Sequence, residues 1–464
     1  GQQFTFQVSA YYSDVANANV ATKKYSIVVT KPPVAGSITI NPESGTCLVD
    51  TFNITAVSWA DPDGGSLQYI FSYIDSKSSV IDLGVSQSSN ILLTTLPSGT
   101  NNGRLTIRIR ATTIYGDFIT ATQEVTVASL PDNQIISGVT AELNNLSDED
   151  PAYFAKASIA LTVLQNKLSG PLSPTEKTQV QSLLLASIEK TARALDRLFS
   201  GGRAIRNTAS LESTQRDALS VSNSLLLATA YPNVLSTELI TTTVSTIQKL
   251  FNAPISAQIY GDELFQTLAT LIDNLQLGYQ ALDSAARFGT NIQTLLTQLL
   301  KLSPQSLVLG NQRTAVKETY ATSMWNAILD SSLSDPVTVG SSARRVAAQS
   351  VDVSLSTDLA DAAFLSGDSS IYALFTKYET LPASYTSSNR TALMQDTIHV
   401  NALRTSNLAS ISNQLQDMYT VRFQVSASPS YTANYFPSNN AADTFSPTCR
   451  YLSGSNWVND TSVC

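Results

Sequence analysis

Few side chains of this chain could carry out acid–base, nucleophilic or metal chemistry, and the histidine count shows this most clearly. The 464 residues include one histidine, His399. A Ser-His-Asp triad or a histidine-containing metal site would have to use it. Ile398 and Val400 fall on the opposite face of its alternating segment, so we expect a structural or solvent-facing histidine. The spacings of phosphate-binding loops, dinucleotide sites, zinc proteases, nucleophile elbows and paired-cysteine sites are missing from the sequence, which predicts a protein that is not an enzyme.

Two carboxylates offer the strongest candidate for a metal site. Asp61 and Asp63 flank Pro62 and are followed by two glycines. Such a loop can contribute to a Ca²⁺ site, but this ion takes roughly six to eight oxygen ligands, so a neighbouring domain would have to supply the rest. A turn in which aspartate accepts backbone N–H bonds and glycine takes positive φ is the favoured interpretation. We therefore expect no cofactor, with Ca²⁺ as the open alternative.

Covalent modification is the other chemistry that the sequence indicates. The three cysteines Cys47, Cys449 and Cys464 are an odd number, which in a secreted chain indicates a free thiol, an intermolecular bond or an incomplete framework. N-linked glycans need Asn-x-Ser/Thr sequons. Such sequons begin at Asn53, Asn145, Asn389 and Asn459. We expect glycans at Asn53 and Asn459 in particular.

The composition also favours a secreted, glycosylated protein. Charged residues make up 14% of the chain, well below the roughly 25% of ordinary soluble domains, and Ser, Thr, Asn and Gln take their place. Such surfaces are common in secreted, glycosylated proteins. The net charge is −8 and no basic run stands out, which argues against nucleic acid as a partner.

The length favours about three domains. The chain opens at Gly1 inside an alternating pattern, ends at Cys464, and contains no apolar run long enough for a membrane helix. We expect a fragment whose ends continue, with membrane attachment only through a region outside this chain.

Period-two alternation predicts strands in 1–30 and in 103–127. We interpret 1–31 as the C-terminal hairpin of a truncated β-sandwich domain. Residues 32–129 would form a complete immunoglobulin- or fibronectin-like sandwich, with Lys31-Pro32-Pro33 as a stiff linker. In the second strand pattern one face is apolar and the other is expected to face outward. The apolar set is Leu105, Ile107 and Ile109, and the outward set is Thr106, Arg108 and Arg110.

From about residue 130 the apolar period becomes three and four, which indicates amphipathic helices. Ser173-Pro174-Thr175-Glu176 predicts a capping box, and the acids at 148–150 suit a helix N-terminus. We expect five or six helices in 148–302 and a helical subdomain over 130–302. After Ser303-Pro304 the alternation returns in 351–355, 372–374 and 421–425, which predicts a β-sandwich over 303–464. The short connection predicts that these two segments form one unit.

Two tryptophans lie in strand patterns. Trp59 and Trp457 could be ligand platforms, but single tryptophans on strands typically fill a sandwich core, and we favour that role. The leucine-rich helical faces likewise indicate bundle core.

Residues 36–73 resemble the receptor-for-egg-jelly (REJ) module of polycystin-type proteins. In that module a Gly and a Pro-x-x-Gly precede a Thr-x-Phe strand, a Trp and a Leu-x-Tyr-x-Phe strand. The matching positions here are Gly36, Pro42, Gly45, Thr51, Phe52, Trp59, Leu67, Tyr69 and Phe71, with Thr51 and Phe52 adjacent. The resemblance implies a cell-surface scaffold.

The C-terminal residues resemble the start of the GPS motif, which closes the GAIN domain of adhesion receptors and polycystin-type proteins. The match rests on Cys449, Tyr451, Trp457 and Cys464. Departures are Leu452 where the family has a second aromatic residue and Val463 where it has Gly. A GAIN domain has a helical subdomain followed by a β-sandwich, so the resemblance implies that order for 130–302 and 303–464.

The GPS resemblance also implies disulfides. In that pattern each leading cysteine bonds one of two later cysteines, which are missing here. Two outcomes stay open: Cys449 bonds Cys464, or each bonds a cysteine on a separate, cleaved C-terminal fragment. We favour the second, which implies a strand edge near Val421–Val425 that is unpaired or filled by another chain. Cys47 is expected to be reduced and packed, or bonded to something outside this sequence.

Two functional hypotheses result. The first is a non-enzymatic extracellular adhesion scaffold, the ectodomain fragment of a polycystin-like membrane protein at the cell surface, with a ciliary or flagellar location implied by the resemblance. The second is a structural glycoprotein subunit of an extracellular filament or flagellar hair, like a mastigoneme. The partners would be other extracellular proteins or copies of the chain itself.

Overall fold

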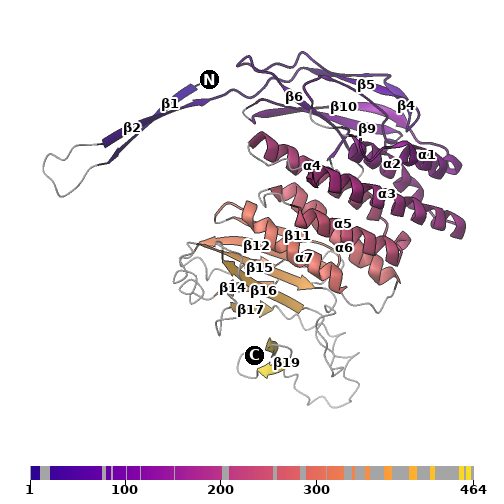
Figure 1. Ribbon diagram of the computed structural model, residues 1–464. Helices are drawn as coiled ribbons and strands as arrows, with labels where there is room; N and C mark the ends of the chain where they lie inside the picture. The colour runs from indigo at the N-terminus through magenta and orange to yellow at the C-terminus, as the bar shows by residue number, and fades with distance from the viewer. Residues whose placement is uncertain are drawn as a thin grey trace. The chain divides into compact units, whose positions relative to one another are not determined.

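The computed structural model describes most of the first 330 residues and separate strands thereafter (Figure 1). The described residues are 2–10, 21–75, 80–84, 87–100, 102–114, 116–150, 152–200, 208–253, 259–282, 289–309, 311–328, 337–339, 351–355, 370–378, 397–404, 419–423, 449–453 and 456–460. The chain divides into two compact units, Gly1–Ser284 and Ala285–Cys464. This division falls inside the predicted helical segment 130–302. The prediction that 130–302 and 303–464 form one unit is therefore wrong for the helices up to residue 282, and the last helix groups with the strands that follow it.

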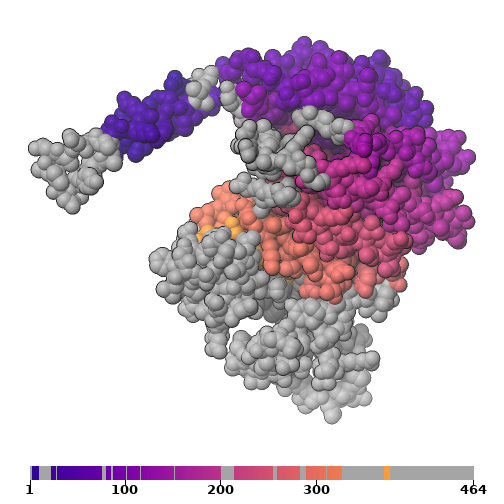
Figure 2. Space-filling view, in the orientation of Figure 1, coloured from indigo at the N-terminus to yellow at the C-terminus, as the bar shows by residue number. Residues whose placement is uncertain are grey.

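The first unit begins with a β-hairpin. Strands β1 (Gln2–Ala10) and β2 (Ala21–Val29) pair antiparallel, as the alternation predicts. The apolar side chains of this hairpin, which Figure 2 draws in indigo, are exposed. They are Phe4, Phe6, Val8, Tyr25, Ile27 and Val29.

Two sheets follow the hairpin and pack face to face. The smaller sheet has the order β3-β5-β8 and the larger has the order β4-β10-β9-β6-β7. Their strands are β3 (Ser37–Asn41), β4 (Ser44–Thr46), β5 (Phe52–Val57), β6 (Gln68–Ile74), β7 (Val80–Asp82), β8 (Ile91–Thr94), β9 (Arg104–Thr112) and β10 (Phe118–Ala128). The short strands predicted over 32–129 are therefore present, in two sheets.

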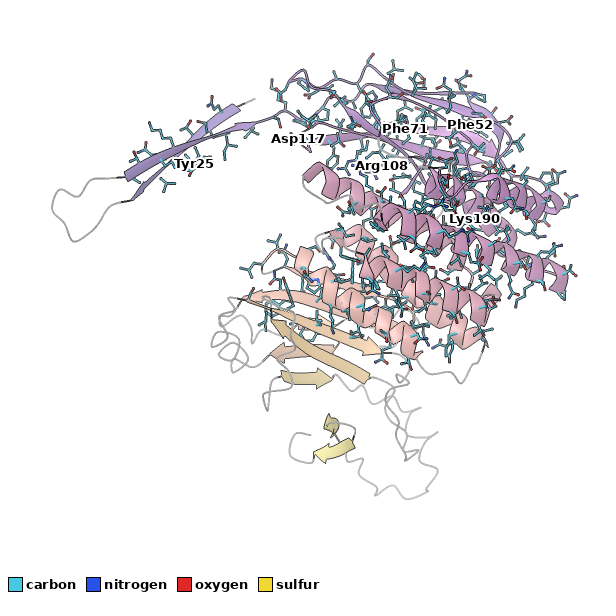
Figure 3. The ribbon with its side chains drawn as sticks, in the orientation of Figure 1. Tyr25, Phe52, Phe71, Arg108, Asp117 and Lys190 are labelled. Atoms are coloured by element: carbon cyan, nitrogen blue, oxygen red, sulfur yellow. The ribbon has the colours of Figure 1, made fainter. Side chains whose placement is uncertain are left out.

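The core between the sheets follows from strict alternation along each strand. On β5, Phe52, Ile54 and Ala56 are buried, while the residues between them are not. On β9, Ile107 and Ile109 are buried as predicted. Figure 3 labels Phe52 and Phe71, which come from the two different sheets.

The opposite face of β9 departs from expectation. Arg108 and Arg110 were predicted to face outward into solvent, but both are partly buried. Their neighbours on β6 share this face: Ile70 lies opposite Arg110 and Ser72 opposite Arg108, and both are buried. The reason is packing against elements that are distant in sequence. Helices of the same unit lie close to this sheet, and they contact it at β7.

Those helices run from residue 132 to residue 282. Their bounds are α1 (Asp132–Asn145), α2 (Tyr153–Leu168), α3 (Pro174–Ser200), α4 (Thr208–Thr229), α5 (Thr237–Asn252) and α6 (Asp262–Leu282), with a 3-10 turn η1 (Pro232–Val234) between α4 and α5. The predicted three-and-four spacing is confirmed on α6, where Leu264, Leu268, Leu271 and Leu275 are fully buried. Their burial places the helical core on this stripe.

The predicted capping box begins α3. The backbone N–H of Ser173 donates to Glu176 Oε2 at 2.9 Å, and the backbone N–H of Glu176 donates to Ser173 Oγ at 3.3 Å. These hydrogen bonds from Ser173, together with Lys167, lower the pKa of the Glu176 carboxyl to about 2. The reciprocal bonds satisfy backbone donors that the helix itself leaves free.

The second unit starts with α7 (Thr290–Leu302) and a 3-10 turn, η3 (Ser303–Ser306). Two side chains hold this turn to the following strands. Arg313 Nη1 donates to the carbonyl of Ser303 at 3.2 Å, and Asn326 Nδ2 donates to the carbonyl of Leu307 at 3.0 Å. The short connection therefore fixes the last helix to the sheet after it.

The strands of this unit form three groups. The orders are β11-β12-β15-β16, β13-β14-β17 and β18-β19. Their bounds are β11 (Gln312–Val316), β12 (Tyr320–Ile328), β13 (Val337–Val339), β14 (Val351–Leu355), β15 (Ser370–Tyr378), β16 (Thr397–Arg404), β17 (Tyr419–Phe423), β18 (Cys449–Ser453) and β19 (Asn456–Asp460). The predicted return to strands after 303 is confirmed, and the order of strands, helices and strands holds for the whole chain.

Candidate functional site

The large apolar residues of the REJ pattern lie in the core of the first unit, whereas Pro42 and Thr51 are exposed. Trp59 is 8% exposed, and its ring lies edge-on to Tyr69 with centroids 6.4 Å apart. Its Nε1–H donates to the carbonyl of Ser37 at 3.1 Å. Leu67 and Phe71, which lie two residues before and after Tyr69 in the sequence, are also buried. Trp59 is therefore a core residue, as favoured from the sequence.

Two pattern glycines are explained by close approach. A Cβ at Gly36 would lie 1.9 Å from the carbonyl oxygen of Val57, which is backbone and cannot move aside. A Cβ at Gly45 would lie 2.8 Å from the ring of Phe52. The pattern thus specifies how β3, β4 and β5 come together, and it is a packing signature.

The two aspartates form the predicted turn. Asp61 Oδ1 accepts the N–H of Asp63 at 2.9 Å, and Asp61 Oδ2 accepts the N–H of Gly65 at 3.1 Å. Gly64 has a φ of 80°. Asp63 Oδ2 accepts the N–H of Lys31 at 2.8 Å, and this bond lowers the pKa of the Asp63 carboxyl. The carboxylates are therefore used by the turn and the linker.

Metal ligands do not gather elsewhere in the described part of the chain. No group of three or more His, Cys, Asp or Glu side chains is placed there to hold an ion. His399 lies on β16, with Thr376 of β15 as its backbone neighbour. Its side chain lies outside the described residues.

The cysteines are separated by the fold. Cys47 is fully buried with a free thiol, and burial raises the pKa of that thiol. Cys47 is thus packed, as expected, while a bond to something outside this sequence stays untested. Cys449 begins β18, where its backbone neighbour is Asp460 of β19. The side chain of Cys449 and all of Cys464 lie outside the described residues, and no disulfide is present within them.

The C-terminal motif residues belong to one hairpin. Tyr451 lies opposite Val458, and Leu452 lies opposite Trp457, in the β18–β19 pair. The side chains of Tyr451 and Trp457 are not described, so the predicted core role of Trp457 stays a prediction. Within the described residues β17 pairs with β14 alone, so it stands at the edge of its sheet.

The sequons differ in their surroundings. Asn53 lies on β5 with its side chain outward, because the flanking Phe52 and Ile54 point into the core. Asn145 is the last residue of α1 and is exposed. Asn389 and the side chain of Asn459 lie outside the described residues.

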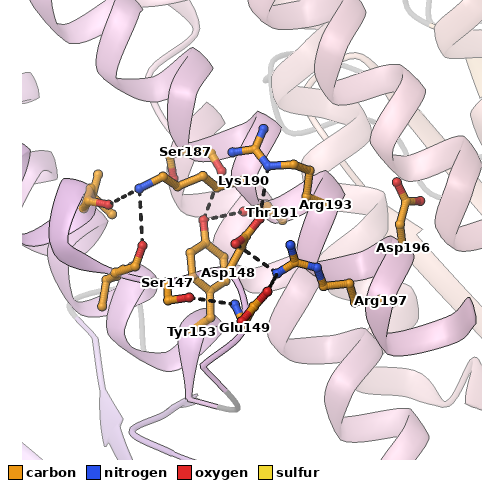
Figure 4. Close-up of polar contacts among 12 residues, drawn as sticks. Ser147, Asp148, Glu149, Tyr153, Ser187, Lys190, Thr191, Arg193, Asp196 and Arg197 are labelled. Carbon is orange, nitrogen blue, oxygen red and sulfur yellow. Dashed lines mark hydrogen bonds and ion pairs between the residues drawn. The ribbon is translucent and has the colours of Figure 1, made fainter. Parts of the chain in front are cut away.

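A polar junction that the sequence did not reveal joins the α1–α2 loop to α3 (Figure 4). Asp148 accepts from Arg193 Nε at 3.1 Å and from Arg197 Nη1 at 3.0 Å. Burial acts against these two arginines, but their bonds and charges leave the pKa of the Asp148 carboxyl lowered. Of the acids predicted to serve a helix N-terminus, Asp150 does so, accepting the N–H of Ala152 at 2.8 Å.

Lys190 completes the junction from α3. Its Nζ donates to the carbonyl of Leu143 at 2.7 Å and to that of Leu146 at 3.3 Å. These carbonyls end α1, where a helix leaves acceptors unpaired and a cation is favourable. Tyr153 of α2 also reaches α3, with its hydroxyl donating to the carbonyl of Ser187 at 3.2 Å. The loop between α1 and α2 is thereby fixed on both sides.

A second charged group lies where the larger sheet approaches the helices. Asp82 of β7 is opposite Ser72, which is opposite Arg108, so all three share the outer face. Burial raises the pKa of the Asp82 carboxyl to about 7; Glu263 of α6 adds to the rise, and Arg216 of α4 acts against it. The sequence gives little indication of this charged group, because Arg216 and Glu263 are distant from Asp82 along the chain.

Comparison with known families agrees with the motif. The REJ domain model matches residues 1–151, which covers the hairpin, both sheets, α1 and the start of the polar junction. A search of curated protein sequences finds no match to the chain. Among the described residues, no helix combines the length and apolarity that crossing a membrane requires. The first third of the chain is thus similar to the REJ domain, a module of the extracellular regions of polycystin-type proteins.

Proposed function

We propose that the chain is a non-enzymatic, extracellular interaction scaffold from a polycystin-like membrane protein. The match of residues 1–151 to the REJ domain carries this proposal. The pattern residues support it by their role, since Trp59 packs in the core and Gly36 permits a close backbone approach. Function would then reside on surfaces, and partners would be other extracellular proteins or further copies of the chain.

The finer part of the proposal concerns residues 130–464. We infer that they correspond to a GAIN-like helical subdomain and β-sandwich that end in a partial GPS motif. The order of helices and strands and the β18–β19 hairpin around Tyr451 and Trp457 support it. Cys449 and Cys464 would then bond cysteines of a following strand segment on a cleaved fragment.

An adhesion assay tests the scaffold function. The chain would be secreted from cultured animal cells behind a signal peptide, purified and coupled to fluorescent beads. We expect the beads to bind each other or a cell surface at least several-fold above beads that carry albumin. Folded, monodisperse chain that binds neither beads nor cells would remove the proposal.

Thiol labelling tests the GPS inference on protein isolated from its natural source, which would retain a cleaved partner fragment. We expect Cys449 and Cys464 to resist alkylation until a reductant is added. Cys47 serves as the internal control, because its buried thiol should label only after unfolding. Labelling of both C-terminal cysteines without reduction, or a bond between the two, would argue against a cleaved partner strand.

A further inference from the structure

The outer face of the smaller sheet is open and partly apolar. Three residues of β5 and β8 expose apolar side chains on it. Val57 is 36% exposed, Ile91 is 44% exposed and Leu93 is 67% exposed. Strand β8 pairs with β5 alone in the described chain. An exposed apolar edge strand invites pairing with another chain, so proteins generally cover or charge such edges.

A sequon lies within this patch. Asn53 is the backbone neighbour of Leu93, and Thr55 is the backbone neighbour of Ile91. Directly opposite residues share a face, with Cβ atoms about 5 Å apart. The acceptor asparagine, its threonine and the two exposed apolar residues therefore form one compact square on the sheet.

The local hydrogen bonding suits modification. Thr55 Oγ1 donates to Asn53 Oδ1 at 3.1 Å. This bond uses the amide oxygen and orients the side chain outward. It leaves Nδ2, the atom that carries a sugar, without a hydrogen bond to any described residue. The neighbours on the other side, Thr39 and Asn41, are polar and exposed.

We propose that an N-linked glycan on Asn53 covers Ile91 and Leu93, so that the sugar completes this sheet face. The inference rests on the proposed extracellular function. The attachment transfers an oligosaccharide from a lipid diphosphate donor. Asn53 Nδ2 forms a bond to the anomeric carbon, the bond from that carbon to the diphosphate oxygen breaks, the lipid diphosphate leaves, and Nδ2 loses one proton. The C–H faces of the first sugars then lie over the apolar side chains, and the outer sugars keep other chains from the β8 edge.

Asn145 provides the matched control. It is exposed at the end of α1, and its nearest apolar neighbours in sequence, Leu143 and Leu146, are already buried. A glycan there would have no exposed apolar neighbour in sequence to cover. The two sites therefore separate a general effect of glycosylation from a covering role at Asn53.

The experiment uses the whole chain secreted from animal cells. Glycopeptide mass spectrometry should find sugar on Asn53. Enzymatic removal of the glycans from the folded protein, which avoids any folding defect, should increase binding of an apolar dye about two-fold or more and cause self-association. Asn53→Gln and Thr55→Ala should do the same, whereas Asn145→Gln should not. Adding Leu93→Ser to Asn53→Gln should restore the monomer.

Three results would overturn the inference. One is a bare Asn53 beside an occupied Asn145, which leaves the extracellular proposal intact. Another is an Asn53→Gln chain that is as monomeric and as poor in dye binding as the parent. The third is a glycosylated chain that forms a dimer and becomes a monomer when Leu93→Ser is introduced. That result would show that a second copy occupies this face. A chain that is neither secreted nor glycosylated would remove the proposed function as well.

Discussion

The two sheets of the first unit present very different outer faces, although side chains alternate between the two faces in both sheets. On the larger sheet, Ile70 is 5% exposed on the outer face, and the helices approach the charged residues around it. On the smaller sheet, Leu93 occupies an equivalent outward position and is 67% exposed. The first face is covered by other parts of the chain, whereas the second face would be covered by a glycan or a partner.

This difference shows where stability and interaction are separated. A sheet buried on both faces contributes two layers of apolar contact, so changes there alter folding. A sheet with one open face can change its outer residues at little cost in folding free energy, so that face is free for a glycan or a partner.

The two outward apolar residues should respond very differently to truncation. Ile70→Ala removes a buried side chain and should lower the free energy of unfolding by about 2–4 kcal/mol. Leu93→Ala should change it by less than about 0.5 kcal/mol. Urea denaturation of the first unit within the whole chain measures both. Equal losses for the two variants would show that the contrast in burial has no energetic counterpart.

Loosening the helices should weaken the covered face indirectly. Asp148→Ala removes the bonds to Arg193 and Arg197 and should cost about 1 kcal/mol, because two partly exposed pairs are lost together. Asp196→Ala breaks an exposed pair in which Lys249 Nζ lies 2.6 Å from Asp196, and this loss should cost under about 0.5 kcal/mol. Thermal unfolding compares them. A larger loss for Asp196→Ala would mean that the junction does not hold α3.

A single hydroxyl connects the larger sheet to α2. The Tyr73 hydroxyl lies 2.6 Å from Thr162 Oγ1, and the tyrosine is fully buried. Tyr73→Phe should cost about 1 kcal/mol and leave Thr162 without this partner. Tyr25→Phe on the exposed hairpin is the control and should change nothing measurable. Hydrogen exchange in α2 should rise only in the first variant.

The pH dependence of stability should carry the signature of Asp82. Its pKa is about 7 in the folded chain and 3.8 in the reference state, so the folded state holds a proton that the unfolded state has already released. The favourable contribution of protonated Asp82 to the free energy of unfolding is present in full below about pH 4 and is lost as the pH rises through about 7. Asp82→Asn should therefore stabilise the chain at pH 8, by up to about 1 kcal/mol because the group is partly exposed.

The control for this titration is the same variant well below pH 4, where Asp82 is protonated in both states and the asparagine should make little difference. The measurement is the difference in unfolding free energy between parent and variant across this range. A difference that does not change with pH would show that Asp82 ionises normally.

Local patterns of the sequence predicted the elements well, because alternation and three-and-four spacing report which side of one element is apolar. Ile107, Leu268 and the capping box at Ser173 are examples. What covers an outward face depends on residues far away. Arg108 looks like a solvent-facing residue of a strand, and its partial burial requires helices that begin more than twenty residues later. Likewise nothing near Asp148 shows that its partners are Arg193 and Arg197, so the polar junction could not be predicted.

The candidate sites divide in the same way. The turn at Asp61 and the core role of Trp59 could be predicted because their partners are local or belong to a single motif. The patch around Asn53 could not, since Leu93 joins it only through strand pairing. A sequon is visible in sequence, but what its sugar would lie against requires the register of β5 and β8.

The segment between the hairpin and the sheets is attached at three points, and this affects how mechanical load would enter the domain. Thr30 Oγ1 donates to Asp117, the N–H of Lys31 donates to Asp63, and Val34 and Ala60 exchange two backbone bonds. Figure 3 labels Asp117 on the loop before β10. A pull on the hairpin would therefore not extend a free tether. The load would be shared at once between the β5–β6 loop, which contains Ala60 and Asp63, and the loop between β9 and β10. Both sheets would therefore bear tension before the linker could extend.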